Sequence, residues 1–154
     1  MATPFPYVSG AVLTSTQLNS MNEAVSFTPS ISTLTIGNGT RTGTYFIQNK
    51  VLYFEVTVTF GSTTTIGTTP DLTLPFAVVG FTQFNPILNT TCFFDNSATA
   101  FVFGNLVLIS STTIRLVSQL ASGTYVAIQD VAATLPFTWA TNDRIIIRGQ
   151  YQVA

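Results

Sequence analysis

The clearest pattern along the chain is a strict alternation of apolar and polar residues over 51–60. Large apolar side chains occupy every second position, and most of the residues between them are polar. This period of two is typical of an antiparallel strand that buries one face. Because only Asn49 and Lys50 separate this segment from residues 40–48, which have strand character, we expect a tight hairpin there.

Further short runs of β-branched and aromatic residues, separated by glycine, proline and asparagine, predict additional strands. They cover residues 32–36, 71–75, 77–82, 91–94, 99–103, 105–110, 113–119, 124–129 and 144–152. A loop rich in threonine and glycine is expected over 61–69. Many short strands with turns between them indicate an all-β fold, and we predict an antiparallel β-sandwich with jelly-roll-like connections over residues 31–154.

Residues 1–30 follow a different pattern, and we expect them to form an extended arm with one short helix. Two prolines favour an extended start, and the segment 13–18 (LTSTQL) has the capping box and hydrophobic staple of a helix N-terminus. A helix over 15–24 would be too short to persist alone in water, so it should dock on a neighbour or on the body. Its apolar face would include Val25. The residues expected to attach the arm are Phe5, Tyr7, Leu13, Leu18 and Met21.

Composition excludes several classes of function. The 154 residues include only 5 basic and 6 acidic side chains, for a net charge of −1, together with 27 threonines. Five scattered basic residues cannot neutralise a phosphate backbone, so we expect no nucleic-acid partner. A mean hydropathy of +0.44 argues against disorder, and prolines and polar residues interrupt the apolar stretches, which argues against membrane insertion. A start without a basic region and the single Cys92 favour synthesis in a cytoplasm.

Candidate chemistry is sparse. The chain has no histidine, so the usual nucleophile–base triads are absent, and no phosphate-binding loop or metal-ligand spacing occurs. Its acidic residues fall mostly at predicted turns, where aspartates cap backbone amides, rather than as a pair suited to glycoside hydrolysis. We therefore expect a protein that is not an enzyme and that has no cofactor and no metal site.

Some predicted strands are apolar on both faces, notably 101–103 and 106–109. The chain itself could cover the second face, but the shortage of charge favours a neighbouring subunit. In the last strand two arginines flank Ile146 on the face opposite Ile145 and Ile147, which suits a contact between subunits; an exposed edge strand protected by arginines is the alternative. The predicted oligomer interface consists of Val102, Val107, Ile109, Arg144, Ile146 and Arg148.

Several segments together resemble tailed-bacteriophage virion proteins, a group that includes minor tail proteins, tail-fibre tips and head-decoration proteins. Residues 11–19 (AVLTSTQLN) resemble the amino-terminal arm of that group. In the body the resemblance continues through 34–40 (LTIGNGT), 43–45 (GTY), 60–64 (FGSTT), 74–75 (LP), 138–143 (TWATND) and 149–151 (GQY). It implies a β-sandwich module of the virion that often forms trimers and has no catalytic residues.

The length favours a short accessory module over a long receptor-reaching fibre. We expect a head-decoration or cement protein, or a tail-fibre or tail adaptor, that is fixed to capsid or tail proteins through its arm and forms a homotrimer. The competing hypothesis is a receptor-recognition module at a tail-fibre tip that binds host surface glycan. Its candidate contacts are Tyr53, Tyr125 and Trp139, each of which could equally fill a core or an interface.

Overall fold

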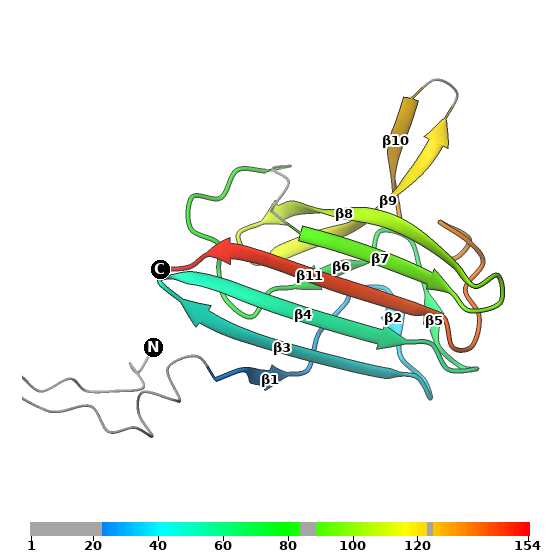
Figure 1. Cartoon of the computed structure of the whole chain (residues 1–154), viewed down its shortest axis with the longest axis horizontal. Helices are drawn as coiled ribbons and strands as arrows, with labels where there is room; N and C mark the ends of the chain where they lie inside the picture. Colours follow the sequence, from blue (N-terminus) through cyan, green and yellow to red (C-terminus); the bar gives the residue numbers. More distant parts are fainter. Residues whose placement is uncertain (1–22, 84–88, 123–124) are drawn as a thin grey trace, which may run out of the picture.

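The computed structural model describes residues 23–83, 89–122 and 125–154, and within these ranges it is all-β with antiparallel sheets and no helix (Figure 1). Nine strands form one sheet in the order β1-β3-β4-β11-β7-β8-β9-β10, with β6 also paired to β9, and β2 pairs separately with β5. The strands are β1 (Val25–Phe27), β2 (Leu34–Thr35), β3 (Thr40–Gln48), β4 (Val51–Thr59), β5 (Thr65–Ile66), β6 (Asp71–Thr73), β7 (Asn89–Asp95), β8 (Ala100–Ser110), β9 (Thr113–Ser122), β10 (Tyr125–Asp130) and β11 (Arg144–Gln152).

The hairpin of β3 and β4 forms as the sequence pattern predicts. Asn49 and Lys50 adopt φ values of 50° and 63°, the conformation that a two-residue turn of this kind requires. The alternation over β4 then places Leu52, Phe54 and two valines in the core, and the residues between them on the outer face. The local turn and the period of two together fix the register of the first large hairpin.

The long strand β8 links the two parts of the sheet. Ala100–Gly104 pairs with β7, and the second half, from Gly104 onward, pairs with β9. A Cβ at Gly104 would lie 2.7 Å from Cε2 of Phe93 and against the carbonyl oxygen of Val117, so only glycine fits this close approach. The expected division into strands 99–103 and 105–110 is therefore wrong, because Gly104 is a packing position within one strand rather than a turn.

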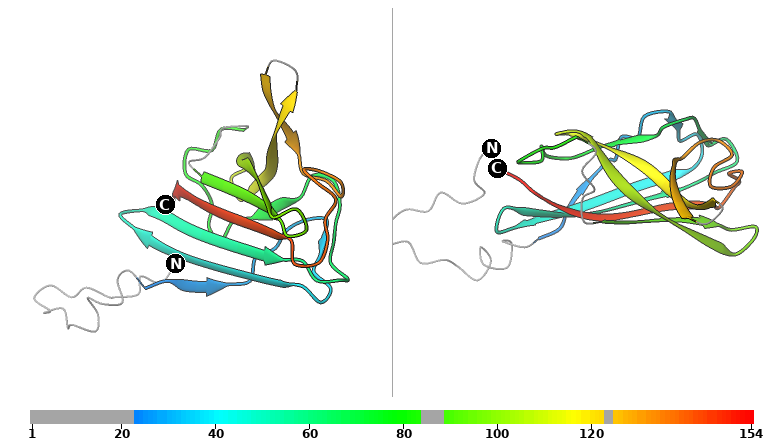
Figure 2. Two further views of the ribbon diagram at one scale, coloured as in Figure 1. Left: turned by 45° about the vertical axis from the view of Figure 1, so that its right-hand side comes forward. Right: turned by 90° about the horizontal axis from the view of Figure 1, so that it is seen from above.

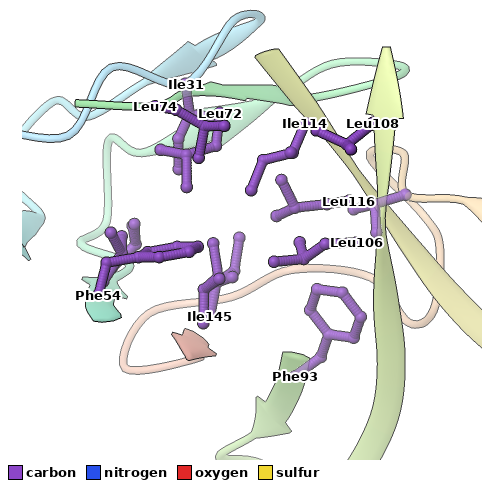
Figure 3. Close-up of a cluster of buried hydrophobic side chains, with 14 of the residues drawn as sticks. Ile31, Phe54, Leu72, Leu74, Phe93, Leu106, Leu108, Ile114, Leu116 and Ile145 are labelled. Carbon is purple, nitrogen blue, oxygen red and sulfur yellow. The ribbon is translucent and has the colours of Figure 1, made fainter. Parts of the chain in front are cut away.

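The hydrophobic core lies between the two parts of the sheet that β8 connects (Figure 3). Phe54, Ile145 and Phe93 enter from β4, β11 and β7, while leucines and Ile114 enter from β6, β8 and β9. Within the described chain the fully covered side chains include Leu106, Leu116 and Ile147. Burial of this apolar surface is the main term that stabilises the fold.

Further expectations differ from the structure or lie outside its described part. Residues 77–82 form no strand, and the expected loop over 61–69 contains the short strand β5. The expected helix over 15–24 lies largely outside the described residues, its last two residues are not helical, and Val25 belongs to β1, where it pairs with Tyr45. The last part of the predicted arm therefore joins the sheet at its β3 edge.

The hairpin of β9 and β10 projects away from the rest of the molecule (Figure 2). Only the first part of β9 pairs with β8, and this ladder ends at the pair Gly104–Ser118. The strand β10 pairs with β9 from Val117 to Ser122, so beyond Ser118 β9 is paired with β10 and no longer with β8. The first residues of β8 and the projecting hairpin thus diverge from one branch point at Gly104.

Candidate functional site

The outer face of the large sheet carries two adjacent rows of side chains where β3, β4 and β11 lie together. Phe46, Tyr53 and Gln150 occupy one row by cross-strand register. In the next row, Glu55 stands between a threonine of β3 and Arg148 of β11. Because residues opposite one another in an antiparallel pair have their Cβ atoms about 5 Å apart, these side chains form one continuous surface.

A groove of about 510 Å³ runs over these two rows. The rings of Phe46 and Tyr53 stack with their centroids 4.8 Å apart and their planes at 8°. Beside them the Nε of Arg148 donates a hydrogen bond of 2.9 Å to Oε2 of Glu55. The residues that line the groove are Ala24, Thr44, Tyr45, Phe46, Tyr53, Phe54, Glu55, Thr90, Arg148, Gly149 and Gln150. The groove thus combines an aromatic pair with hydrogen-bonding side chains of both charges.

The ion pair in the groove contributes little to stability. The side chains of Arg148 and Glu55 are 68% and 45% exposed, and pairs this accessible to water are typically worth less than about 1 kcal/mol. By contrast, Arg115 joins β9 to β6 through two hydrogen bonds to Asp71, at 2.9 and 3.2 Å, with both side chains mostly covered. The Arg115–Asp71 pair therefore contributes to the stability of the fold, whereas the Arg148–Glu55 pair in the groove adds little to it.

A second surface lies beyond the branch point at Gly104. Phe101 and Phe103 of β8 are 58% and 57% exposed, and Val126 and Ile128 of β10 are 69% and 57% exposed. By register all four belong to the same nominal face of the sheet, on two segments that diverge from Gly104: the first part of β8 and the strand β10. We call these four residues the apolar surface.

The structure does not gather the predicted interface residues on one surface. Arg144, Ile146 and Arg148 share the outer face of β11, where the guanidinium of Arg144 lies 4.8 Å from the ring centroid of Phe94. Val107 and Ile109 are half-buried in the second half of β8, and Val102 packs against the core. Since β11 lies between β4 and β7, the alternative of an edge strand protected by arginines is wrong.

The predicted glycan contacts also lie in different environments. Tyr53 lines the groove. Trp139 packs against the core: its ring stacks on Phe60 at 4.6 Å, and its indole N–H donates a 2.9 Å hydrogen bond to the carbonyl of Ala132. The side chain of Tyr125 lies outside the described part of the chain, as do the predicted attachment residues Phe5, Tyr7, Leu13, Leu18 and Met21.

The sequence predictions missed most of the groove. Phe46 was identifiable in principle, because the Asn49-Lys50 turn fixes the register that places it opposite Tyr53. Gln150 and Arg148 were not, because their positions depend on β11 pairing with β4 across about ninety residues of chain, and local pattern does not specify a pairing of that kind. The exposure of Phe101 and Phe103 depends in the same way on the divergence of β9 from β8.

Among the described residues, no group of acidic or cysteine side chains is arranged to hold a metal ion. The same part of the chain contains no helix long and apolar enough to cross a membrane. Comparison of the chain with protein-family models, with curated proteins and with solved structures finds no match. Interpretation of the two surfaces therefore depends on their own chemistry.

Proposed function

We propose that this chain is a non-enzymatic structural protein of a tailed-bacteriophage virion, a small exterior module that associates with copies of itself. Its role would be that of a head-decoration or cement protein, or of a tail-fibre or tail adaptor, with the N-terminal arm attached to capsid or tail proteins. In this proposal the sheets form a β-sandwich with jelly-roll-like connections, and the assembled state is a homotrimer located on the particle.

The observation that carries the proposal is the apolar surface. With roughly 150–250 Å² for a phenylalanine side chain, the exposed fractions of Phe101, Phe103, Val126 and Ile128 leave on the order of 400 Å² of apolar area. That is about half of the ~800 Å² that one partner contributes to a standard interface. The partner we propose is a second copy of this chain, because the four side chains are uncharged and a net charge of −1 produces little repulsion between copies.

Sedimentation velocity tests the self-association. The chain at about 10 µM should sediment as a trimer, and replacement of both Phe101 and Phe103 by serine should convert it to a monomer with an unchanged circular dichroism spectrum. Phe81→Ser is the matched control, since Phe81 is 38% exposed and lies outside the apolar surface. A wild-type chain that sediments as a monomer, or a double variant that remains a trimer, would reject the proposed interface.

A truncation tests attachment through the arm. Deletion of residues 2–22 removes most of the predicted arm but retains β1, which pairs with β3. The shortened chain should fold and sediment like the full chain yet fail to bind particles that lack this protein. Normal occupancy of the shortened chain on such particles would contradict an attachment role for the arm.

A further inference from the structure

We propose that the groove over β3, β4 and β11 binds a neutral saccharide, with the stacked rings of Phe46 and Tyr53 as the apolar platform and Glu55, Arg148 and Gln150 as the hydrogen-bonding groups. This inference concerns a different surface from the apolar surface and does not depend on the virion assignment. It identifies a ligand class and a residue set for one face of the molecule.

The shape and lining of the groove fit a ligand of this size. About 510 Å³ is within the range of typical ligand sites, which combine apolar and aromatic walls with a few convergent polar groups. The ring pair is held at 4.8 Å and 8° by the register between β3 and β4, so the platform is set by the hairpin before any ligand arrives. Aromatic rings of this kind offer large contact area at a low cost in side-chain entropy.

The polar groups favour a ligand rich in hydroxyl groups. Only one guanidinium nitrogen of Arg148 and one oxygen of Glu55 take part in their mutual hydrogen bond, and no further partner of these two side chains is found among the described residues. The remaining guanidinium N–H groups can donate and the remaining carboxylate oxygen can accept. A sugar hydroxyl both donates and accepts, so adjacent hydroxyls can satisfy both side chains together.

The balance of charge separates a neutral ligand from a charged one. Glu55 and Arg148 lie in direct contact at 2.9 Å, and Phe46, Tyr53 and Gln150 add no charge. An anionic ligand attracted to Arg148 would be repelled by the adjacent Glu55. A cationic ligand attracted to Glu55 would be repelled by Arg148 in the same way. A neutral saccharide avoids this repulsion.

The experiment uses the full chain and defined oligosaccharides. The probes are neutral hexasaccharides of glucose, galactose and mannose, with a hyaluronan hexasaccharide as the acidic comparison, and binding is measured by titration calorimetry and by saturation-transfer NMR. At least one neutral probe should bind at millimolar concentration or below. Phe46→Ala and Tyr53→Ala should each weaken that binding at least tenfold, while Phe81→Ala, a matched aromatic control outside the groove, should leave it unchanged.

A second variant protects the test against a loss of folding. Glu55→Gln keeps the side-chain volume and removes only an exposed charge, so the thermal unfolding curve should be unchanged while affinity for the neutral probe falls several-fold. Absence of binding by every neutral probe up to 10 mM would overturn the proposal. Binding that is unaffected by Phe46→Ala, Tyr53→Ala and Glu55→Gln, or a preference for hyaluronan that Glu55→Gln strengthens, would overturn it as well.

Discussion

Replacement of Gly104 by alanine tests whether the branch point of the sheet depends on close packing. The added methyl group would lie 2.7 Å from Cε2 of Phe93 and against the backbone carbonyl of Val117. Ordinary contact between carbon atoms is about 3.5–4.0 Å, so the ring of Phe93 or the strand β9 must move by about 1 Å. Neither can do so freely, because Phe93 is fully buried and its ring packs edge-on against Trp139 with the centroids 5.9 Å apart.

The expected cost follows from this crowding. Extra methyl groups in a well-packed core typically destabilise by about 1–3 kcal/mol, and the upper part of that range applies here because one of the two neighbours of Gly104 is backbone. For a chain of 154 residues, each kcal/mol corresponds to about 2–4 °C in Tm. Gly104→Ala should therefore lower Tm by several degrees and the free energy of unfolding by about 2–3 kcal/mol.

Equilibrium unfolding in urea, followed by the fluorescence of Trp139, measures this change. Trp139 is the single tryptophan of the chain and contacts Phe93, so it reports on the region that the substitution disturbs. Phe93→Leu provides the second arm of a double-mutant cycle: if the ring carries part of the clash, Gly104→Ala should cost at least 0.5 kcal/mol less in that background. A single variant within about 0.5 kcal/mol of the parent protein would refute the packing role of Gly104.

Two further predictions concern polar contacts that stabilise the fold. Burial raises the pKa of Tyr151 to about 12, and its hydroxyl donates a hydrogen bond of 3.1 Å to the carbonyl of Phe76. The unfolded chain loses the Tyr151 proton near pH 10. The free energy of unfolding should therefore be unaffected below pH 10 and fall between pH 10 and 12. Tyr151→Phe should remove that part of the fall in urea titrations, and an identical slope in both proteins would contradict it. Arg115→Leu should cost about 1–2 kcal/mol, because Asp71, only 19% exposed, loses its bidentate partner; the double variant with Asp71→Leu should recover part of the loss, and urea curves in which Arg115→Leu matches the parent would contradict this.

The elements that the sequence predicts best are those that local physics decides. Residues 40–48 match β3 at both ends, because the Asn49-Lys50 turn joins them to the alternating segment 51–60. Residues 144–152 match β11 at both ends, because apolar residues recur there at alternate positions. The apolar run 77–82 fails for a tertiary reason: Val78 N–H donates to the carbonyl of Ser111, and Val79 N–H to that of Gln152. Its backbone groups bond to separate segments of the chain, so no ladder forms despite favourable strand propensity.

The predictions of surface residues depended on information that local pattern does not contain. The alternation in β11 correctly places Arg144 and Arg148 opposite Ile145 and Ile147, yet it cannot tell a central strand from an edge strand. The sequence alone allows Trp139 to lie either at the surface or in the core, and in the structure its ring stacks on Phe60. The pattern of β11 therefore indicates which side chains lie on its outer face. Which strands lie beside that face can be known only from the order of strands in the sheet.

That order places the two proposed surfaces on different strands of the large sheet. The groove occupies β3, β4 and β11, the apolar surface occupies β8 and β10, and β7 separates them in the sheet. Copies that associate through Phe101, Phe103, Val126 and Ile128 would therefore leave the groove available. Self-association would also present several grooves on one particle, and linked sites can bind a repeating ligand far more tightly than a single site does. Each groove is open and contains an exposed ion pair, so a single groove would bind a saccharide weakly. Several grooves in one assembly would raise the overall affinity for a repeating saccharide.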